Sequence, residues 1–310
     1  MSDSAIHAIA GAAGGIVAMS ATYPLIFLST RAAVETKKEQ KSTYQAIVDI
    51  IKREGALGLY SGLSSSLLGI AVTNGVYYYF YERSREIILR ARTGTNKALS
   101  TPESMLTGLI AGSATTVLSN PIWVIQTSQA VRTMGEDNQA ITTKKLGFLE
   151  TVQSILAKDG VGAFWRGIGP ALVLVINPII QYTAFEQLKN FIVSRRTSKL
   201  RAAGAATAVA VLTDMDFFLL GALSKLIATT LTYPYIVVKS RLQAGSANAL
   251  KYKSSLDGLL TIVKEEGIEG LYKGIGSKVV QSVLTAAILF AGQRRIFEMT
   301  KASLQPLVKA

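Results

Sequence analysis

The sequence contains no cysteine, so disulfide bonds and thiolate metal ligands are excluded. It contains one histidine, His7, and therefore lacks the imidazole cluster that a typical transition-metal site requires. It also has no P-loop string, no nucleophile elbow and no constellation of paired carboxylates. We therefore expect no catalytic residues, no metal site and no prosthetic group, and we predict that the protein is not an enzyme.

Charged side chains are scarce as well, at 17% of the 310 residues, whereas about 25% is usual in soluble proteins. Hydrophobic residues reach 49% and the mean hydropathy is +0.32, which is typical of a membrane protein. The charge that is present is basic, with 33 Lys and Arg against 20 Asp and Glu. Because the basic residues lie mostly at the edges of apolar segments, we expect membrane lipids and small anions as partners, and no nucleic acid.

Apolar residues gather in six long segments, each of which is predicted to cross the membrane as a helix. The segments cover residues 5–36, 65–90, 103–133, 168–195, 213–244 and 277–303. Small and polar residues interrupt them, as expected for helices with one face toward lipid and another toward water. The pairs Gly11/Gly15 and Gly108/Gly112 have the spacing that predicts close packing of membrane helices.

Three sequence markers recur in the same order, which indicates three copies of one structural unit. The first is a proline within an apolar segment, at Pro24, Pro121 and Pro234. The second is an acidic-Gly pair followed by an aromatic-x-Gly string, at residues 54–62, 159–167 and 266–274. The third is an aromatic-acidic-x-x-basic string, at residues 81–85 and 185–189.

We place the repeats at residues 1–100, 101–205 and 206–310. Each is predicted to contain a long helix kinked at its proline, a short amphipathic helix in the membrane plane and a second long helix. The short helices are predicted at residues 44–54, 148–158 and 255–265. Three kinked helices related by pseudo-threefold symmetry would converge and close one end of a cavity.

These triplicated motifs resemble those of the mitochondrial carrier family, and the resemblance covers nearly the whole chain. It implies an all-α membrane protein with six transmembrane helices in three pseudo-symmetric two-helix repeats and three short in-plane surface helices. It also implies a central binding site that opens alternately through two gates. We expect such a carrier to function as a monomer.

The gate motif on the proline-containing helices departs from the family pattern Pro-x-acidic-x-x-basic-x-basic. Its acidic positions hold Ile26, Trp123 and Ile236, and its basic positions hold Ser29, Gln126, Lys239, Arg31, Ser128 and Arg241. Apolar packing is therefore expected to replace the family's ion pairs. Arg31, Lys239 and Arg241 are expected to lack carboxylate partners and to attract the anionic solute. The alternative is a positive rim that only orients the protein.

The opposite gate is expected from the third marker. Glu82/Arg85 and Glu186/Lys189 match the family's pairs, whereas Gln293 and Ile296 stand where the third pair would be. Exposed ion pairs contribute only about 0–1 kcal/mol each, so a missing pair need not abolish gating.

Several strings resemble one branch of the family, the peroxisomal carriers of adenine-containing cofactors. These strings lie at residues 74–80, 120–127, 177–181 and 278–287. The resemblance implies exchange of ATP and AMP, coenzyme A, FAD or NAD across the peroxisomal membrane, serving fatty-acid β-oxidation. The alternatives are a mitochondrial inner-membrane carrier of FAD, NAD or folate, and a carrier-shaped assembly factor that transports nothing.

Candidate solute contacts follow from the family's spacing and from polar residues inside apolar segments, which are costly unless they face water or a partner. The candidates are Gly69, Ile70, Asn74, Tyr78, Asn177, Gln181, Lys225, Lys278 and Gln281. Gly69 and Ile70 would form a slot for an adenine ring. At least one tyrosine of the run Tyr77, Tyr78, Tyr79 and Tyr81 would stack on a purine, with Tyr78 as the candidate. Lys225 would meet a phosphate as a point charge. The alternatives are that Gly69 serves helix packing, that Asn177 satisfies a helix kink and that Lys225 extends to the membrane surface.

Overall fold

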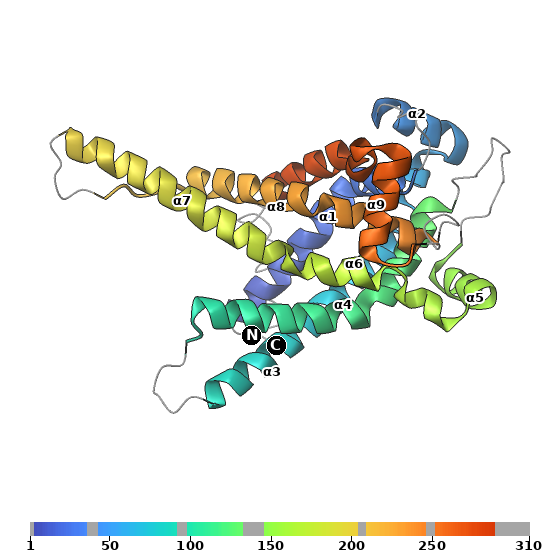
Figure 1. Ribbon diagram of the computed structural model, residues 1–310, viewed down its shortest axis with the longest axis horizontal. Helices are drawn as coiled ribbons and strands as arrows, with labels where there is room; N and C mark the ends of the chain where they lie inside the picture. The colour runs from blue at the N-terminus through green and yellow to red at the C-terminus, as the bar shows by residue number, and fades with distance from the viewer. Residues whose placement is uncertain are drawn as a thin grey trace, which may run out of the picture. The chain divides into compact units, whose positions relative to one another are not determined.

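The computed structural model describes residues 3–35, 43–91, 98–132, 146–203, 209–245 and 252–288 (Figure 1). Within these ranges the regular secondary structure is helical, without a strand. The long helices are α1 (Asp3–Val34), α3 (Leu63–Arg90), α4 (Thr101–Val131), α7 (Asn177–Ala202) and α8 (Asp214–Ala244). The shorter ones are α2 (Thr43–Glu54), α5 (Phe148–Asp159), α6 (Ile168–Val173) and α9 (Ser255–Glu266). Short 3₁₀ helices are η1 (Ala56–Tyr60), η2 (Val161–Trp165), η3 (Leu174–Ile176) and η5 (Ile268–Tyr272).

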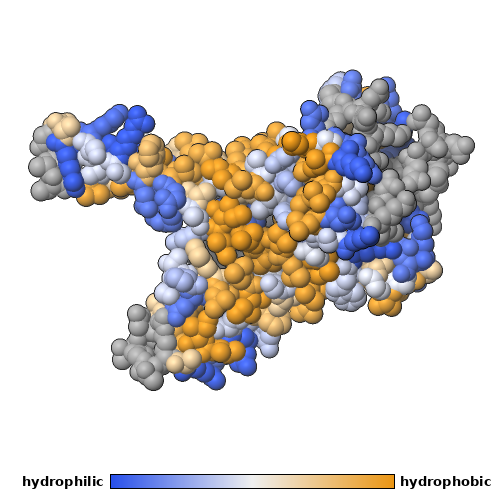
Figure 2. Space-filling view, in the orientation of Figure 1, coloured by the Kyte–Doolittle hydropathy of each residue, from blue (hydrophilic) through white to orange (hydrophobic). Residues whose placement is uncertain are grey.

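Five described helical stretches are long and apolar enough to cross a membrane: Gly14–Val34, Ala56–Arg90, Thr101–Val131, Val161–Ala202 and Asp214–Ala244. They match five of the six predicted segments. The sixth begins as a helix at residues 275–288, and the rest of it lies outside the described residues. In the space-filling view, apolar residues cover the visible surface of these helices along their middle, while polar residues gather toward the C-terminal end of α7 (Figure 2).

The three short amphipathic helices are confirmed as α2, α5 and α9, within one residue of the predicted bounds. Each ends at the first glycine of the second marker, because Gly55, Gly160 and Gly267 have φ of 75°, 75° and 76°. A positive φ is strained for residues with a Cβ and stops the helix. A five-residue 3₁₀ helix then leads to the second glycine of the marker. The triplicated marker is therefore a turn motif.

Apolar packing joins the proline-containing helix, the short helix and the 3₁₀ helix in the second and third repeats. The buried residues that pack together include Val124, Ile125, Ile155 and Phe164 in the second repeat, and Val237, Val238, Ile262 and Leu271 in the third. The residues at the same positions of the first repeat are buried as well: Phe27, Leu28, Ile50 and Leu59. Pro24, Pro121 and Pro234 lie inside α1, α4 and α8, which continue past them. We call α1, α4 and α8 the proline helices.

The described residues fall into two compact units. One unit is drawn from residues 27–179 and 231–275, and contains α3, α4, the three short helices and the C-terminal parts of α1 and α8. We call it the short-helix unit. The other is drawn from residues 1–26, 180–230 and 276–310, and contains most of α7 and the N-terminal parts of α1 and α8. We call it the α7 unit.

Two structural expectations need correction. The fourth apolar segment is not one regular helix, because η3 interrupts it between α6 and α7. Close packing is not found at Gly15 within the described part of the chain, since a Cβ there would meet no atom within 4 Å. It is present at Gly112, where a Cβ would lie 2.6 Å from Val175 Cγ1 in η3. Gly112 therefore allows α4 to approach the interrupted helix.

Candidate functional site

The structure overturns the prediction that Arg31 lacks a carboxylate partner. Its Nη1 lies 2.8 Å from Glu54 Oε1, and both side chains are only 11% exposed. Its Nε donates to the carbonyl oxygen of Ala130 at 2.7 Å, near the C-terminus of α4. The guanidinium also lies over the ring of Phe27, 4.2 Å from its centroid. The partner comes from the acidic-Gly marker and not from the family's gate position, where Ile26 stands.

Arg241 is corrected in the same way. Its side chain is 1% exposed and binds both carboxylate oxygens of Glu266, with Nη2 at 2.9 Å from Oε2. Lys273 reaches the same carboxylate, with Nζ 2.7 Å from Oε2. Arg241 Nε donates to Ala33 O at 3.0 Å, and Lys273 Nζ donates to Glu35 O at 3.0 Å, both at the C-terminus of α1. A buried guanidinium without a carboxylate would carry a large desolvation cost, which the pairing offsets.

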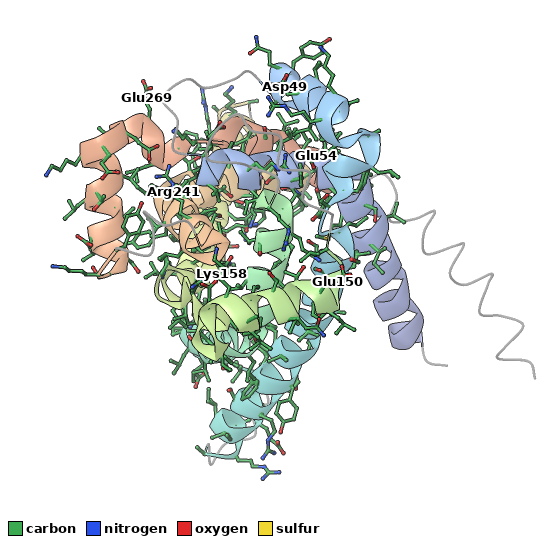
Figure 3. All side chains as sticks on the ribbon, turned by 90° about the vertical axis from the view of Figure 1, so that its right-hand side faces the viewer. Asp49, Glu54, Glu150, Lys158, Arg241 and Glu269 are labelled. Atoms are coloured by element: carbon green, nitrogen blue, oxygen red, sulfur yellow. The ribbon has the colours of Figure 1, made fainter. Side chains whose placement is uncertain are left out.

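The electrostatics of Glu266 reflect this pairing. Burial by itself raises the pKa of the Glu266 carboxyl, but the hydrogen bonds from Arg241 and Lys273 outweigh burial. The pKa is therefore lower than its usual value, and the carboxylate is charged at neutral pH. Figure 3 views the short-helix unit from the side of α2, α5 and α9, with Glu54 labelled on α2 and Arg241 on α8.

The second repeat has Ser128 where the other two have arginine. Its marker acid, Asp159, instead pairs with Arg166, whose Nη1 lies 3.0 Å from Asp159 Oδ2. Arg166 belongs to the aromatic-x-Gly string of the marker, at the position that holds Ser61 in the first repeat and Lys273 in the third. Sequence reasoning missed these marker acids and basic residues as a functional set, although their recurrence at one spacing was visible.

Lys239 fits the prediction better than the two arginines. It is half-buried on α8, and among the residues that the structure describes its ammonium has no hydrogen-bond or ion-pair partner. Its charge is therefore not neutralised by a described carboxylate. The role of Lys239 in attracting an anion stays a prediction.

Apolar side chains occupy the acidic positions of the gate motif, as the sequence indicated. Trp123 packs on Gly69, where a Cβ would lie 3.3 Å from the indole Cζ2. The Trp123 Nε1 donates to Thr73 Oγ1 at 3.3 Å. Ile236 packs against the buried cluster of Val237 and Ile262. Gly69 thus serves helix packing in this structure, which is the alternative interpretation of that residue.

The other candidates on α3 are accessible. Ile70 is half-buried, and Asn74 and Tyr78 are exposed, with Tyr78 in an edge contact to Tyr77 at 6.3 Å between ring centroids. Asn177 lies at the start of α7, and its Nδ2 donates to Thr232 Oγ1 on α8 at 2.7 Å. Asn177 therefore bonds a neighbouring helix through its amide nitrogen.

The α7 unit contains the remaining candidates. Gln281 is 8% exposed and its Nε2 donates to Thr285 Oγ1 at 2.9 Å, and this hydroxyl is 3.1 Å from Thr22 Oγ1 on α1. Gln181 and Lys278 are half-buried, and Lys225 is exposed midway along the apolar part of α8. A lysine in such a segment needs water, a polar partner or the membrane surface. The solute-binding role of these residues stays a prediction.

The charges of the third marker pair within their own helices. In the short-helix unit, Arg85 Nη1 lies 3.4 Å from Glu82 Oε2 on α3. In the α7 unit, Lys189 Nζ lies 2.7 Å from Glu186 Oε1 on α7. Both pairs join residues three apart on one helix, so each stabilises its helix in this structure. Gln293 and Ile296 lie outside the described residues.

Comparison with known proteins identifies the family to which the chain belongs. The sequence profile of the mitochondrial carrier protein family matches three successive stretches, residues 2–92, 97–196 and 202–306. The chain belongs to the mitochondrial carrier family. It is 35% identical to the peroxisomal nicotinamide adenine dinucleotide carrier of Arabidopsis thaliana, with 98% of each chain covered. It is 33% identical to the peroxisomal membrane protein PMP47B of Candida boidinii, over 98% of this chain and 88% of the relative.

A third relative is the peroxisomal adenine nucleotide transporter 1 of Saccharomyces cerevisiae, at 28% identity over 97% of this chain and 92% of the relative. This mitochondrial carrier protein is thus a multi-pass membrane transporter and not an enzyme. In chemical terms, its described residues offer an apolar gate surface around Trp123 and an unpaired ammonium at Lys239, together with several amide side chains.

Proposed function

We propose that this carrier exchanges adenine nucleotides or adenine-containing cofactors across the peroxisomal membrane and so supports fatty-acid β-oxidation. The solutes are ATP and AMP, coenzyme A, FAD or NAD, which share an adenosine moiety and negatively charged phosphates. The names of the relatives support both the organelle and the solute class. Six membrane helices in three pseudo-symmetric repeats, at residues 1–100, 101–205 and 206–310, would surround the solute and expose it alternately to the two sides.

The observation that carries this proposal is the state of Lys239. The acidic residues that would neutralise a basic gate residue are replaced by Ile26, Trp123 and Ile236. Lys239 is half-buried without a described partner, so its positive charge can be balanced by a solute phosphate. Arg31 and Arg241 are already bound to Glu54 and Glu266, and we therefore assign anion contact chiefly to Lys239.

The adenosine part of the solute would meet less polar groups. In the short-helix unit, Ile70 and Tyr78 offer apolar and aromatic surface, and Asn74 offers amide hydrogen bonds. The candidates of the α7 unit are proposed separately as solute contacts: Gln181, Lys225, Lys278 and Gln281. One strong charge contact combined with shape contacts would accept more than one adenosine phosphate.

Reconstituted liposomes test the proposal. Vesicles that contain the purified protein and unlabelled ATP are given labelled ATP, AMP, coenzyme A, FAD or NAD outside, and uptake is followed. We expect counter-exchange of at least one of these solutes. Lys239→Gln is expected to raise the apparent KM about tenfold or more, since a charged hydrogen bond contributes roughly 1.5–3 kcal/mol.

Lys264→Gln is the matched control, because Lys264 is an exposed lysine on α9. It is expected to leave exchange unchanged. Absence of exchange for all five solutes would instead favour the non-transporting assembly factor. A fluorescent tag on the full chain would locate the organelle, and a mitochondrial signal would favour the inner-membrane alternative.

A further inference from the structure

The short-helix unit contains three arginine–carboxylate pairs that share one arrangement. Each pair joins an arginine to the acid of the acidic-Gly marker, and each arginine lies at the C-terminal end of a proline helix from the next repeat. The pairs are Arg31–Glu54, Arg166–Asp159 and Arg241–Glu266. We call these three pairs the clamps.

The contacts of the clamps form a closed cycle. Arg31 of the first repeat donates to Ala130 O near the end of α4, in the second repeat. Arg241 of the third repeat donates to Ala33 O near the end of α1, in the first repeat. Arg166 of the second repeat lies at the end of α8, in the third repeat, where its Nη1 would be 2.8 Å from a Cβ added at Gly245.

The positions of the arginines follow from helix electrostatics. The last carbonyl groups of a helix have no partner within the helix, and the helix dipole makes this end negative. A guanidinium at such an end donates to free carbonyl oxygens and meets a favourable field. The marker acid on its other side neutralises the cation and fixes its orientation. The first and third clamps therefore bind a helix end of one repeat to the short helix of another, and Arg166 of the second clamp lies close to the end of α8.

The second clamp differs from the others in where its arginine originates. The first and third repeats place it on the proline helix itself, whereas the second repeat has Ser128 there and supplies Arg166 from the marker string. This string lies close against α8, since a Cβ added at Gly167 would lie 3.0 Å from Lys239 O. The interface gains side-chain amide bonds as well: Asn120 Nδ2 donates to Arg166 O at 3.1 Å, and Gln243 Nε2 donates to Asn120 Oδ1 at 3.1 Å.

We propose that the three clamps close the gate at the C-terminal ends of the proline helices, in place of the ion pairs that this chain lacks, and that Arg166 substitutes for the arginine missing at Ser128. The inference rests on the alternating access of the proposed function, because a gate matters only in a carrier. Opening at this end separates α1, α4 and α8 and must break the clamp contacts between repeats. Arg166 acts through α8 and is a positioning residue, without contact to the solute.

The absence of cysteine makes a direct accessibility test possible, because a single introduced thiol gives a signal without background. Thr127→Cys reports on the interface between α4 and α8, since Thr127 is 4% exposed and donates to Gln243 Oε1 at 3.3 Å. Ser224→Cys, on the N-terminal half of α8 and 0% exposed, reports on general loosening of the protein. Both are treated in liposomes with a membrane-impermeant thiol reagent applied to either side.

Arg166→Gln is expected to speed modification of Thr127→Cys by about tenfold, the factor that corresponds to about 1.4 kcal/mol. It is expected to leave the rate at Ser224→Cys unchanged. The double change Ser128→Arg and Arg166→Ser moves the arginine onto α4 and copies the arrangement of the first repeat. It is expected to restore the slow modification of Thr127→Cys. Arg53→Gln is the control, because Arg53 is an exposed arginine beside Glu54.

Three results would overturn the proposal: an unchanged rate at Thr127→Cys in Arg166→Gln, an equal increase at both reporters, or failure of the relocated arginine to restore the slow rate. The labelling measures the gate whether or not the solute class has been assigned correctly. If no solute is exchanged, but labelling is slow and becomes faster in Arg166→Gln, the proposed function is refuted and the proposal on the clamps stands. If solute is exchanged, but labelling does not depend on Arg166, the clamps are refuted and the proposed function stands.

Discussion

Replacing Glu266 by glutamine tests whether the clamp carboxylates stabilise the protein. Glu266 is the common partner of Arg241 and Lys273, whose side chains are 1% and 7% exposed. Glutamine keeps the size of the side chain and removes its charge, so two buried cations would face a neutral amide. Removing one partner of a buried ion pair typically costs about 3–5 kcal/mol. For a chain of this size, such a loss lowers the melting temperature by roughly 10 °C.

The measurement is thermal unfolding in detergent, followed by the intrinsic fluorescence of Trp123 and Trp165. Glu269→Gln is the matched control, because this exposed glutamate lies on η5, directly after the helix that ends with Glu266. It should change stability by no more than about 0.5 kcal/mol. Adding Arg241→Gln to Glu266→Gln removes one of the two cations left without a carboxylate. The melting temperature of the double variant should therefore fall by less than the sum of the decreases in the two single variants. A Glu266→Gln protein that melts within about 1 °C of the parent would refute the reasoning.

The remaining predictions concern pH, a missing cation and a glycine. Because hydrogen bonding lowers the folded pKa of Glu266 below its usual value of 4.5, its contribution is present above that pH and is lost as the pH falls through the folded pKa. The difference in melting temperature between the parent and Glu266→Gln should therefore shrink as the pH falls below 4.5, and a constant difference would contradict the assignment. Ser61→Lys copies into the first repeat the lysine of the third repeat, Lys273, which there pairs with the marker acid Glu266. We expect it to stabilise by about 1 kcal/mol, measured as a higher melting temperature, and a lower one would speak against equivalent clamps. Gly274→Ala should cost several kcal/mol, because φ is +83° and a Cβ would lie 2.7 Å from a backbone carbonyl oxygen of α1. Gly267→Ala, with φ of +76° and open space around the Cβ, should cost only about 1–2 kcal/mol in the same unfolding assay.

Much of the fold was predictable, because it depends on local signals that recur. The acidic-Gly and aromatic-x-Gly strings require positive φ at both glycines and so fix where α2, α5 and α9 end. Apolar length located the membrane helices. The interruption at η3 directly precedes Asn177-Pro178, where a helix kink was one of the interpretations, because a proline leaves the carbonyl group four residues earlier without its helical partner. The close approach of Val175 to Gly112 joins distant segments and could not be predicted from local signals.

The partners of the arginines could not be assigned from spacing along one helix. The family pattern places the gate acid two residues after the proline, where Ile26, Trp123 and Ile236 stand. The acids that bind Arg31 and Arg241 come from the short helices, on a separate part of each repeat. Their pairing depends on the tertiary fold. The triplicated acid was visible in the sequence, but it was interpreted only as part of a structural turn.

The clamps also determine where positive charge remains for a solute. Counting only the ionised groups within the clamps, Arg31 with Glu54 sums to zero, and so does Arg166 with Asp159. In the third repeat, Arg241 and Lys273 share the single charge of Glu266, so this clamp keeps a net charge of +2 − 1 = +1. Lys239, also in the third repeat, adds a further unpaired charge. Among the groups counted here, the net positive charge is thus in the third repeat, since the paired charges largely cancel at a distance. Under the proposed function, phosphates are therefore expected to approach on the side of α8.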